Sequence, residues 1–202
     1  MTITHRIRSG ALPGLVALSL CLGAGRFAAQ SAATAPSKEQ ADDAAAFKEF
    51  GIRVQAFVKL SKAADATLPA LKPTDVPELI AAHQQALARK IQEARPKAKA
   101  GDLFTSDAIE AFRHASRPLE GPKAAGSRAY MQSDGPNPAM RLSVNGIYPD
   151  TEPITPLSPA LLAAFPPLPA EVSYRIVDRS LLLVDLKSRL IVDFARGILP
   201  PA

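Results

Sequence analysis

Two histidines carry most of the catalytic and metal-binding potential of this 202-residue chain. His83 and His114 can each act as a general base or, through a neutral ring nitrogen, as a metal ligand. Nucleophilic catalysis would also need a serine or threonine and an orienting acid, and the sequence contains no G-x-S-x-G turn. A transition-metal site would bring both histidines together with an Asp or Glu. The sequence contains no H-x-x-x-H pair, a spacing that would indicate such a site.

A structural interpretation of both histidines is simpler. His83 lies between Ile80 and Leu87 on an apolar helical seam, which is typical of a packed histidine hydrogen-bonded to a neighbour. His114 lies beside Arg113 and Arg117, which predicts a position at the surface. We therefore predict no catalytic residue and no cofactor, and we assign no residue to a metal. A role beyond structure for His83 or His114 stays open.

Acid pairs are a second candidate chemistry. Asp42 with Asp43, and Asp150 with Glu152, are the pairs in question. A glycosidase needs two carboxylates held across a cleft. A helix start explains the first pair better, and a turn explains the second.

Basic residues form the third candidate cluster. They gather over residues 89–99, with Arg113 and Arg117 further along the chain. Such a stretch is a solvated face or a contact for an acidic lipid, polymer or protein. The absence of aromatic residues nearby disfavours nucleic acid, which uses them for base stacking.

Residues 1–35 are typical of a secretory signal peptide. Arg6 and Arg8 precede an apolar run over 11–22, and small residues follow it. The run is shorter than the roughly 20 residues that cross a bilayer, so we expect cleavage and no transmembrane span in the mature chain. An uncleaved anchor and a lipoprotein acylated at Cys21 are the alternatives. The large residue before Cys21 disfavours acylation.

Cleavage changes the composition. Residues 1–35 contain three of the 24 Lys and Arg and none of the 19 Asp and Glu, so the net charge falls from +5 to +2. The lower charge weakens the case for a nucleic-acid partner. Loss of the single Cys excludes disulfides and thiolate chemistry in the mature chain. A chain that is 47% hydrophobic is too apolar for wholesale disorder.

Residues 36–117 are predicted to be helical. Ser37 and Gln40 fit a capping box at the start of a first helix that Pro69 ends. Its apolar seam repeats at steps of three and four, with polar Ser61 inside it. The seam consists of Phe47, Phe50, Val54, Phe57, Ser61, Ala64 and Leu68.

Two further helices follow in this region. Asp75 and Glu78 are predicted to cap the second helix, which Pro96 stops. A short third helix begins after Thr105. The link over 69–74 is short, which predicts that the first two helices run antiparallel.

The remainder of the chain has a different composition. Residues 118–202 contain 13 of the 19 prolines. Residues 118–165 read as a Pro-rich connector: an extended linker over 118–156, with packing against the helices as one option, and a brief helix from Ser158 to Phe165. Residues 166–202 contain three apolar runs separated by turn-length gaps, which predicts an antiparallel β-meander. Residues 181–184 are apolar at every position, as in a central strand covered on both faces.

The end of the chain resembles a known hairpin. Tyr-Arg-Ile-Val at 174–177, Leu-Leu-Leu-Val-Asp at 181–185 and Leu-Ile-Val-Asp at 190–193 follow Leu-Pro at 168–169. They are similar to the C-terminal hairpin of RcnB-type periplasmic nickel/cobalt homeostasis proteins. The whole chain also resembles an uncharacterised secreted bacterial family. These resemblances imply an exported protein with a C-terminal hairpin, and a metal-related role as one option.

The sequence thus predicts an α+β fold. We expect an antiparallel helical hairpin plus a short third helix, a Pro-rich connector and a C-terminal three-stranded antiparallel β-meander. The predicted function is a non-enzymatic interaction module of the bacterial cell envelope, periplasmic or secreted. Its predicted partner is an unidentified envelope protein or a second copy of the chain. A periplasmic metal-homeostasis or metal-binding protein is the alternative, and an enzyme comes third.

Overall fold

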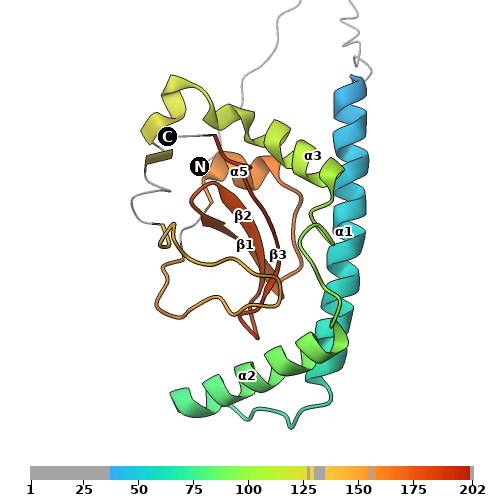
Figure 1. Ribbon diagram of the computed structural model, residues 1–202, viewed down its shortest axis with the longest axis vertical. Coiled ribbons are helices and arrows are strands. Elements are labelled where there is room, and N and C mark those ends of the chain that lie inside the picture. Colours follow the sequence, from blue (N-terminus) through green and yellow to red (C-terminus); the bar gives the residue numbers. More distant parts are fainter. Residues whose placement is uncertain (1–36, 127, 130–134, 155–156, 201–202) are drawn as a thin grey trace, which may run out of the picture. The chain divides into compact units, whose positions relative to one another are not determined.

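A computed structural model describes residues 37–126, 128–129, 135–154 and 157–200. The predicted signal peptide lies outside these residues. The fold is α+β, with helices and a three-stranded antiparallel sheet (Figure 1). In chain order the elements are α1 (Lys38–Asp65), α2 (Pro77–Ala94), α3 (Ser106–Ser116), the 3₁₀ turns η1 (Arg117–Leu119) and η2 (Pro122–Ala124), α5 (Pro159–Ala164), β1 (Val172–Val177), β2 (Ser180–Asp185) and β3 (Ile191–Ala195).

The sheet is the predicted meander, with β2 between β1 and β3. Every residue of β2 is buried, which confirms a central strand covered on both faces. Asp178 and Arg189 occupy the two turns with φ angles of 53° and 59°. Aspartate tolerates this left-handed conformation better than most residues.

The helices cover only one face of the sheet. Leu181 and Leu183 belong to the large core cluster that includes residues of α1, α2, α3 and α5. On the opposite face, Leu182 and Val184 pack with Tyr148 of the connector. The prediction that the connector lies against the helices holds for its two ends, because Leu119 and Leu161 pack in the core cluster that the helices line. Because β2 is apolar on both faces and the helices cover one, the connector covers the other.

Backbone hydrogen bonds attach the connector to β3. The Tyr148 N–H donates to the carbonyl of Arg189, and the Ile191 N–H donates to the carbonyl of Gly146, both at 2.8 Å. A short bridge joins Ile147 to the residue before β3. The connector thus extends the sheet by one short, irregular edge, which Figure 1 shows beside the strands.

Helix α1 follows the prediction closely. Its capping box is present, since the Ser37 hydroxyl accepts from the Gln40 N–H and the Gln40 side chain accepts from the Ser37 N–H. Phe50, Val54 and Ser61 of the seam are buried. The Ser61 hydroxyl donates to the buried Asp185 carboxylate over 2.9 Å. This bond is the physical reason for a polar residue within the apolar seam.

Helix α2 differs from its prediction at its start. Val76 is the N-cap and makes no side-chain capping bond, so the predicted Asp75–Glu78 capping pair is wrong. The Thr74 hydroxyl instead accepts from the Val76 N–H at 3.2 Å. Eleven residues, 66–76, link α1 to α2. With this longer link, α2 turns back toward α1 but crosses its C-terminal end rather than running alongside it (Figure 1).

A buried aspartate joins the sheet to the loop between α2 and α3. Asp193 of β3 is 0% exposed. Its carboxylate accepts backbone N–H bonds from Gly101, Leu103 and Phe104 at 3.1, 2.7 and 2.9 Å. It also accepts from the N–H of Phe194 at 2.8 Å. These bonds replace the water that the charged group gives up, and they fix the point at which α3 begins.

Asp193→Asn should destabilise the fold strongly. The amide NH₂ would face backbone N–H donors and leave them unsatisfied, so we expect a loss of about 3 kcal/mol or more in the free energy of unfolding. Urea denaturation measures the loss. The matched control is exposed Asp75→Asn, which should change stability by less than about 0.5 kcal/mol. Equal stability of the two variants would contradict the role assigned to Asp193.

Candidate functional site

An acidic groove lies between the first half of α1 and helix α3. Its volume is about 780 Å³. Lys38 and His114 are the basic side chains among its lining residues, and Ala45 and Ala46 supply apolar surface. The carboxylates that line it are Glu39, Asp42, Asp43, Glu49, Asp107 and Glu110. We refer to this surface as the acidic groove.

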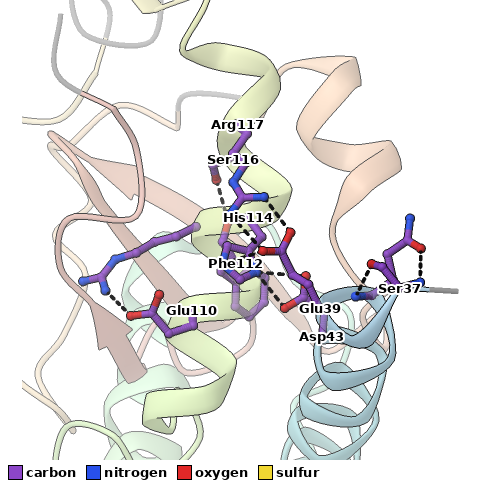
Figure 2. Close-up of polar contacts among 10 residues, drawn as sticks. Ser37, Glu39, Asp43, Glu110, Phe112, His114, Ser116 and Arg117 are labelled. Carbon is purple, nitrogen blue, oxygen red and sulfur yellow. Dashed lines mark hydrogen bonds and ion pairs between the residues drawn. The ribbon is translucent and has the colours of Figure 1, made fainter.

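Aromatic packing sets the position of α3 against α1. Phe112 is fully buried. Its ring centroid lies 5.0 Å from that of Phe47 and 5.1 Å from that of Phe50, both in edge-on arrangements that aromatic pairs favour. Two residues beyond Phe112, the side chain of His114 faces α1 at the edge of this packing (Figure 2).

His114 forms a polar cluster with the start of α1. Its Nδ1 lies 2.9 Å and 3.1 Å from the two carboxylate oxygens of Asp43. Its Nε2 lies 3.9 Å from Oε2 of Glu39. Arg117 donates to both oxygens of Glu39, at 2.6 and 3.3 Å. Figure 2 shows the four side chains converging from α1 and the end of α3. The His114 side chain is 24% exposed and lines the acidic groove, so it lies at the surface as predicted, although α1 covers part of it.

The electrostatics of this cluster depend on Arg117. Its hydrogen bond lowers the pKa of the Glu39 carboxyl below the usual 4.5, and the charges of Arg117 and His114 act in the same direction. Slight desolvation opposes the shift without reversing it. The same pairing raises the pKa of Arg117. Glu39 is therefore anionic over the whole physiological range.

His83 forms a second histidine–aspartate pair, at the other end of α1. Its Nε2 lies 3.1 Å from Oδ1 of Asp65, and Lys187 from the β2–β3 turn donates to Oδ2 of Asp65 at 2.6 Å. Asp43 and Asp65 are 22 residues apart on one helix, or about 33 Å at 1.5 Å per residue. The two histidines therefore do not meet, and a metal site built from both is not formed.

Two of the basic residues singled out in the sequence make contacts within the chain. Arg95 is half-buried, donates to the carbonyl of Val192 and lies 5.2 Å above the ring of Phe57. Burial lowers the pKa of Arg95, although nearby acids oppose the effect. Arg113 pairs with Glu110 at 2.7 Å. Arg95 therefore stabilises the fold, and Arg113 lies at the rim of the acidic groove.

The two acid pairs singled out in the sequence have different roles in the structure. Asp150 pairs with Arg189, and Glu152 accepts from the backbone N–H of Asn137 at 2.8 Å. This pair stabilises a turn, in agreement with the prediction. Asp42 and Asp43 do more than begin a helix, because both line the acidic groove.

Sequence reasoning missed the acidic groove itself. The available signal was the spacing of Glu39, Asp43, Ala46 and Glu49, which fall three and four residues apart beside the apolar seam. That spacing predicts one acidic helix face. Nothing in the spacing indicates that α3 lies opposite this face.

Comparisons with protein-family models, with curated proteins and with solved structures find no match for this chain. The resemblance of the C-terminal hairpin to RcnB-type proteins therefore stays a prediction. In the structure, the two aspartates that end its strand motifs, Asp185 and Asp193, are buried and hydrogen-bonded within the chain. No helix among the described residues is long and apolar enough to cross a bilayer.

The Asp65 cluster should contribute to acid sensitivity. Burial acts to raise the pKa of Asp65, but the hydrogen bonds from Lys187 and His83 outweigh it and lower the pKa below 3.8. Ionised Asp65 therefore stabilises the folded chain at pH values above the pKa that it has in the unfolded chain. This stabilisation is lost as the pH falls through the lower pKa that Asp65 has in the folded chain. Lys187→Gln should cost less than about 1 kcal/mol at neutral pH.

Urea denaturation of Lys187→Gln and of the unaltered chain at several pH values measures this effect. We expect the difference in unfolding free energy to shrink toward zero once the pH lies below 3.8. The control is Lys59→Gln, which replaces an exposed lysine on α1, the helix that carries Asp65. A difference for Lys187→Gln that stays constant down to strongly acidic pH would contradict the assignment.

Proposed function

We propose that this chain is an exported, non-enzymatic interaction module of the bacterial envelope, and that its acidic groove binds a cationic segment of a partner. The observation that carries the proposal is the concentration of six carboxylates around one open hollow of about 780 Å³. Opposite charge on a partner segment would speed its association and fix its register.

The lining of the groove suits lysine and arginine side chains in particular. Long basic side chains lay their aliphatic stems on apolar surface and extend their charged ends toward acceptors. Ala45 and Ala46 provide such a surface. Asp42 and Asp107 are exposed on opposite sides of it, one on α1 and one on α3. A segment that lies along the groove can therefore reach carboxylates from both helices.

Export rests on the first residues of the chain. Arg6 and Arg8, the apolar run over 11–22 and the small residues after it fit a secretory signal peptide. The proposed location is the periplasm or the cell exterior. The proposed partner is an envelope protein with a basic segment, or a second copy of the chain that presents its own exposed basic residues.

Metal binding is the second candidate function. The observation in its favour is that ligand atoms of Glu39, Asp43 and His114 all lie within 4.8 Å of one another. The resemblance of the hairpin to nickel/cobalt homeostasis proteins supports the same candidate. The groove's overall charge favours a cationic segment as the main partner, because a metal ion would engage only one end of the groove.

Binding of a fluorescent oligo-arginine peptide tests the main proposal. The unaltered chain should bind it with an affinity that falls as salt screens the charges. The double variant Asp42→Asn, Asp107→Asn removes one carboxylate from each side of the groove and should weaken binding about tenfold at low salt. Fluorescence anisotropy measures both quantities.

The matched control is Asp75→Asn, Glu78→Gln, which removes two exposed acids near the start of α2. This variant has the same net charge as the groove variant and should bind the peptide almost as tightly as the unaltered chain. Equal weakening in both double variants would show that binding follows net charge alone. That result would contradict a binding site in the acidic groove.

A further inference from the structure

Asp43 holds the ring of His114 in one orientation. An ionised carboxylate only accepts hydrogen bonds, and both Asp43 oxygens lie within 3.1 Å of Nδ1. Nδ1 must therefore carry the proton that is donated to Asp43. In the neutral ring, the free lone pair is then on Nε2.

Glu39 lies in front of that lone pair. Oε2 of Glu39 is 3.9 Å from Nε2 of His114, which is too long for a hydrogen bond. Zinc binds both nitrogen and oxygen donors at about 2.0–2.2 Å, so two donors of one ion lie up to about 4 Å apart. A shift of a few tenths of an ångström in the exposed Glu39 side chain brings the pair closer to the separation of tetrahedral ligands.

We propose that Nε2 of His114 and a carboxylate oxygen of Glu39 bind a divalent transition-metal ion of the zinc class, with water at its remaining positions. Asp43 is the positioning residue, because a carboxylate on the distal nitrogen of a ligating histidine fixes its tautomer and raises its basicity. A mixed imidazole and carboxylate donor set favours zinc, nickel or cobalt over magnesium or calcium. This site rests on the second candidate function, metal binding, and specifies its ligands, whereas it does not depend on the peptide-binding role.

Arg117 competes with the metal for Glu39. Its guanidinium donates to both Glu39 oxygens, so an ion must share Glu39 or displace Arg117 from it. The repulsion between the two cations lowers the affinity further. Removal of this arginine should therefore tighten metal binding.

His83 provides an internal comparison. It also contacts an aspartate of α1, Asp65, at 3.1 Å. The other oxygen of Asp65 accepts a hydrogen bond from the cation Lys187. Nε2 of His83 is the nitrogen that faces Asp65, so the carboxylate does not orient this ring to present Nε2. Both histidines therefore contact an aspartate of α1. The His114 ring turns Nδ1 toward its aspartate and Nε2 toward Glu39, whereas the His83 ring turns Nε2 toward its aspartate.

Titration of the full chain with Zn²⁺, followed by NMR of the imidazole nitrogens, tests the site. The Nε2 resonance of His114 should shift with saturation, while both nitrogens of His83 stay unchanged. Calorimetry on variants should show that His114→Gln and Glu39→Gln each abolish saturable binding at this site. Asp43→Asn should weaken it about 10–100-fold, the usual effect of losing the partner of a ligating histidine.

Arg117→Gln and His83→Gln complete the series. Arg117→Gln should tighten Zn²⁺ binding several-fold, and His83→Gln should leave the affinity unchanged. Glu39→Gln retains an acceptor for Arg117, so it reports on the metal even if His114→Gln unfolds the chain. Three results would overturn the proposal. They are the absence of saturable Zn²⁺ binding, a shift of the His114 Nδ1 resonance instead of the Nε2 resonance, and an equal loss of Zn²⁺ affinity in the His83 and His114 variants. The peptide test uses Asp42 and Asp107, so each idea can fail without the other.

Discussion

The need to bury both faces of β2 is the constraint on which the structure depends. A strand that is apolar at consecutive positions is stable only between two covering layers, and every residue of β2 is buried. The helices provide one layer and the Pro-rich connector provides the other. The fold therefore needs the connector as much as the helices, although the connector has little regular structure.

Buried carboxylates then fix where the layers meet. Asp185 binds Ser61 of α1, and Asp193 binds the backbone just before α3. Because these bonds are directional and costly to leave unmade, they position both helices against the sheet more closely than apolar contact alone. The aromatic contact of Phe112 with α1 completes the arrangement. The acidic groove is the surface that remains open between the two helices.

Local features of the fold were predictable from sequence. The caps at Ser37 and Thr105, the brief helix after Ser158 and the three strands depend on neighbouring residues, and all are present. The course of the connector, the crossing of α2 and the pairing of His114 with Asp43 were not predictable. His114 and Asp43 are 71 residues apart, and their contact depends on how whole helices pack against the sheet. The acids of the candidate site were visible in the sequence, but the groove that they line was not.

We propose that the face shared by α1 and α3 is the binding surface of this chain. Amide hydrogen exchange of the full chain, with and without a saturating oligo-arginine peptide, tests this claim most directly because it reports on every segment at once. We expect slower exchange confined to the start of α1 and to the first turns of α3, with α2 and the sheet unchanged. Slower exchange confined to α2 or to the connector, or unchanged exchange throughout, would contradict it.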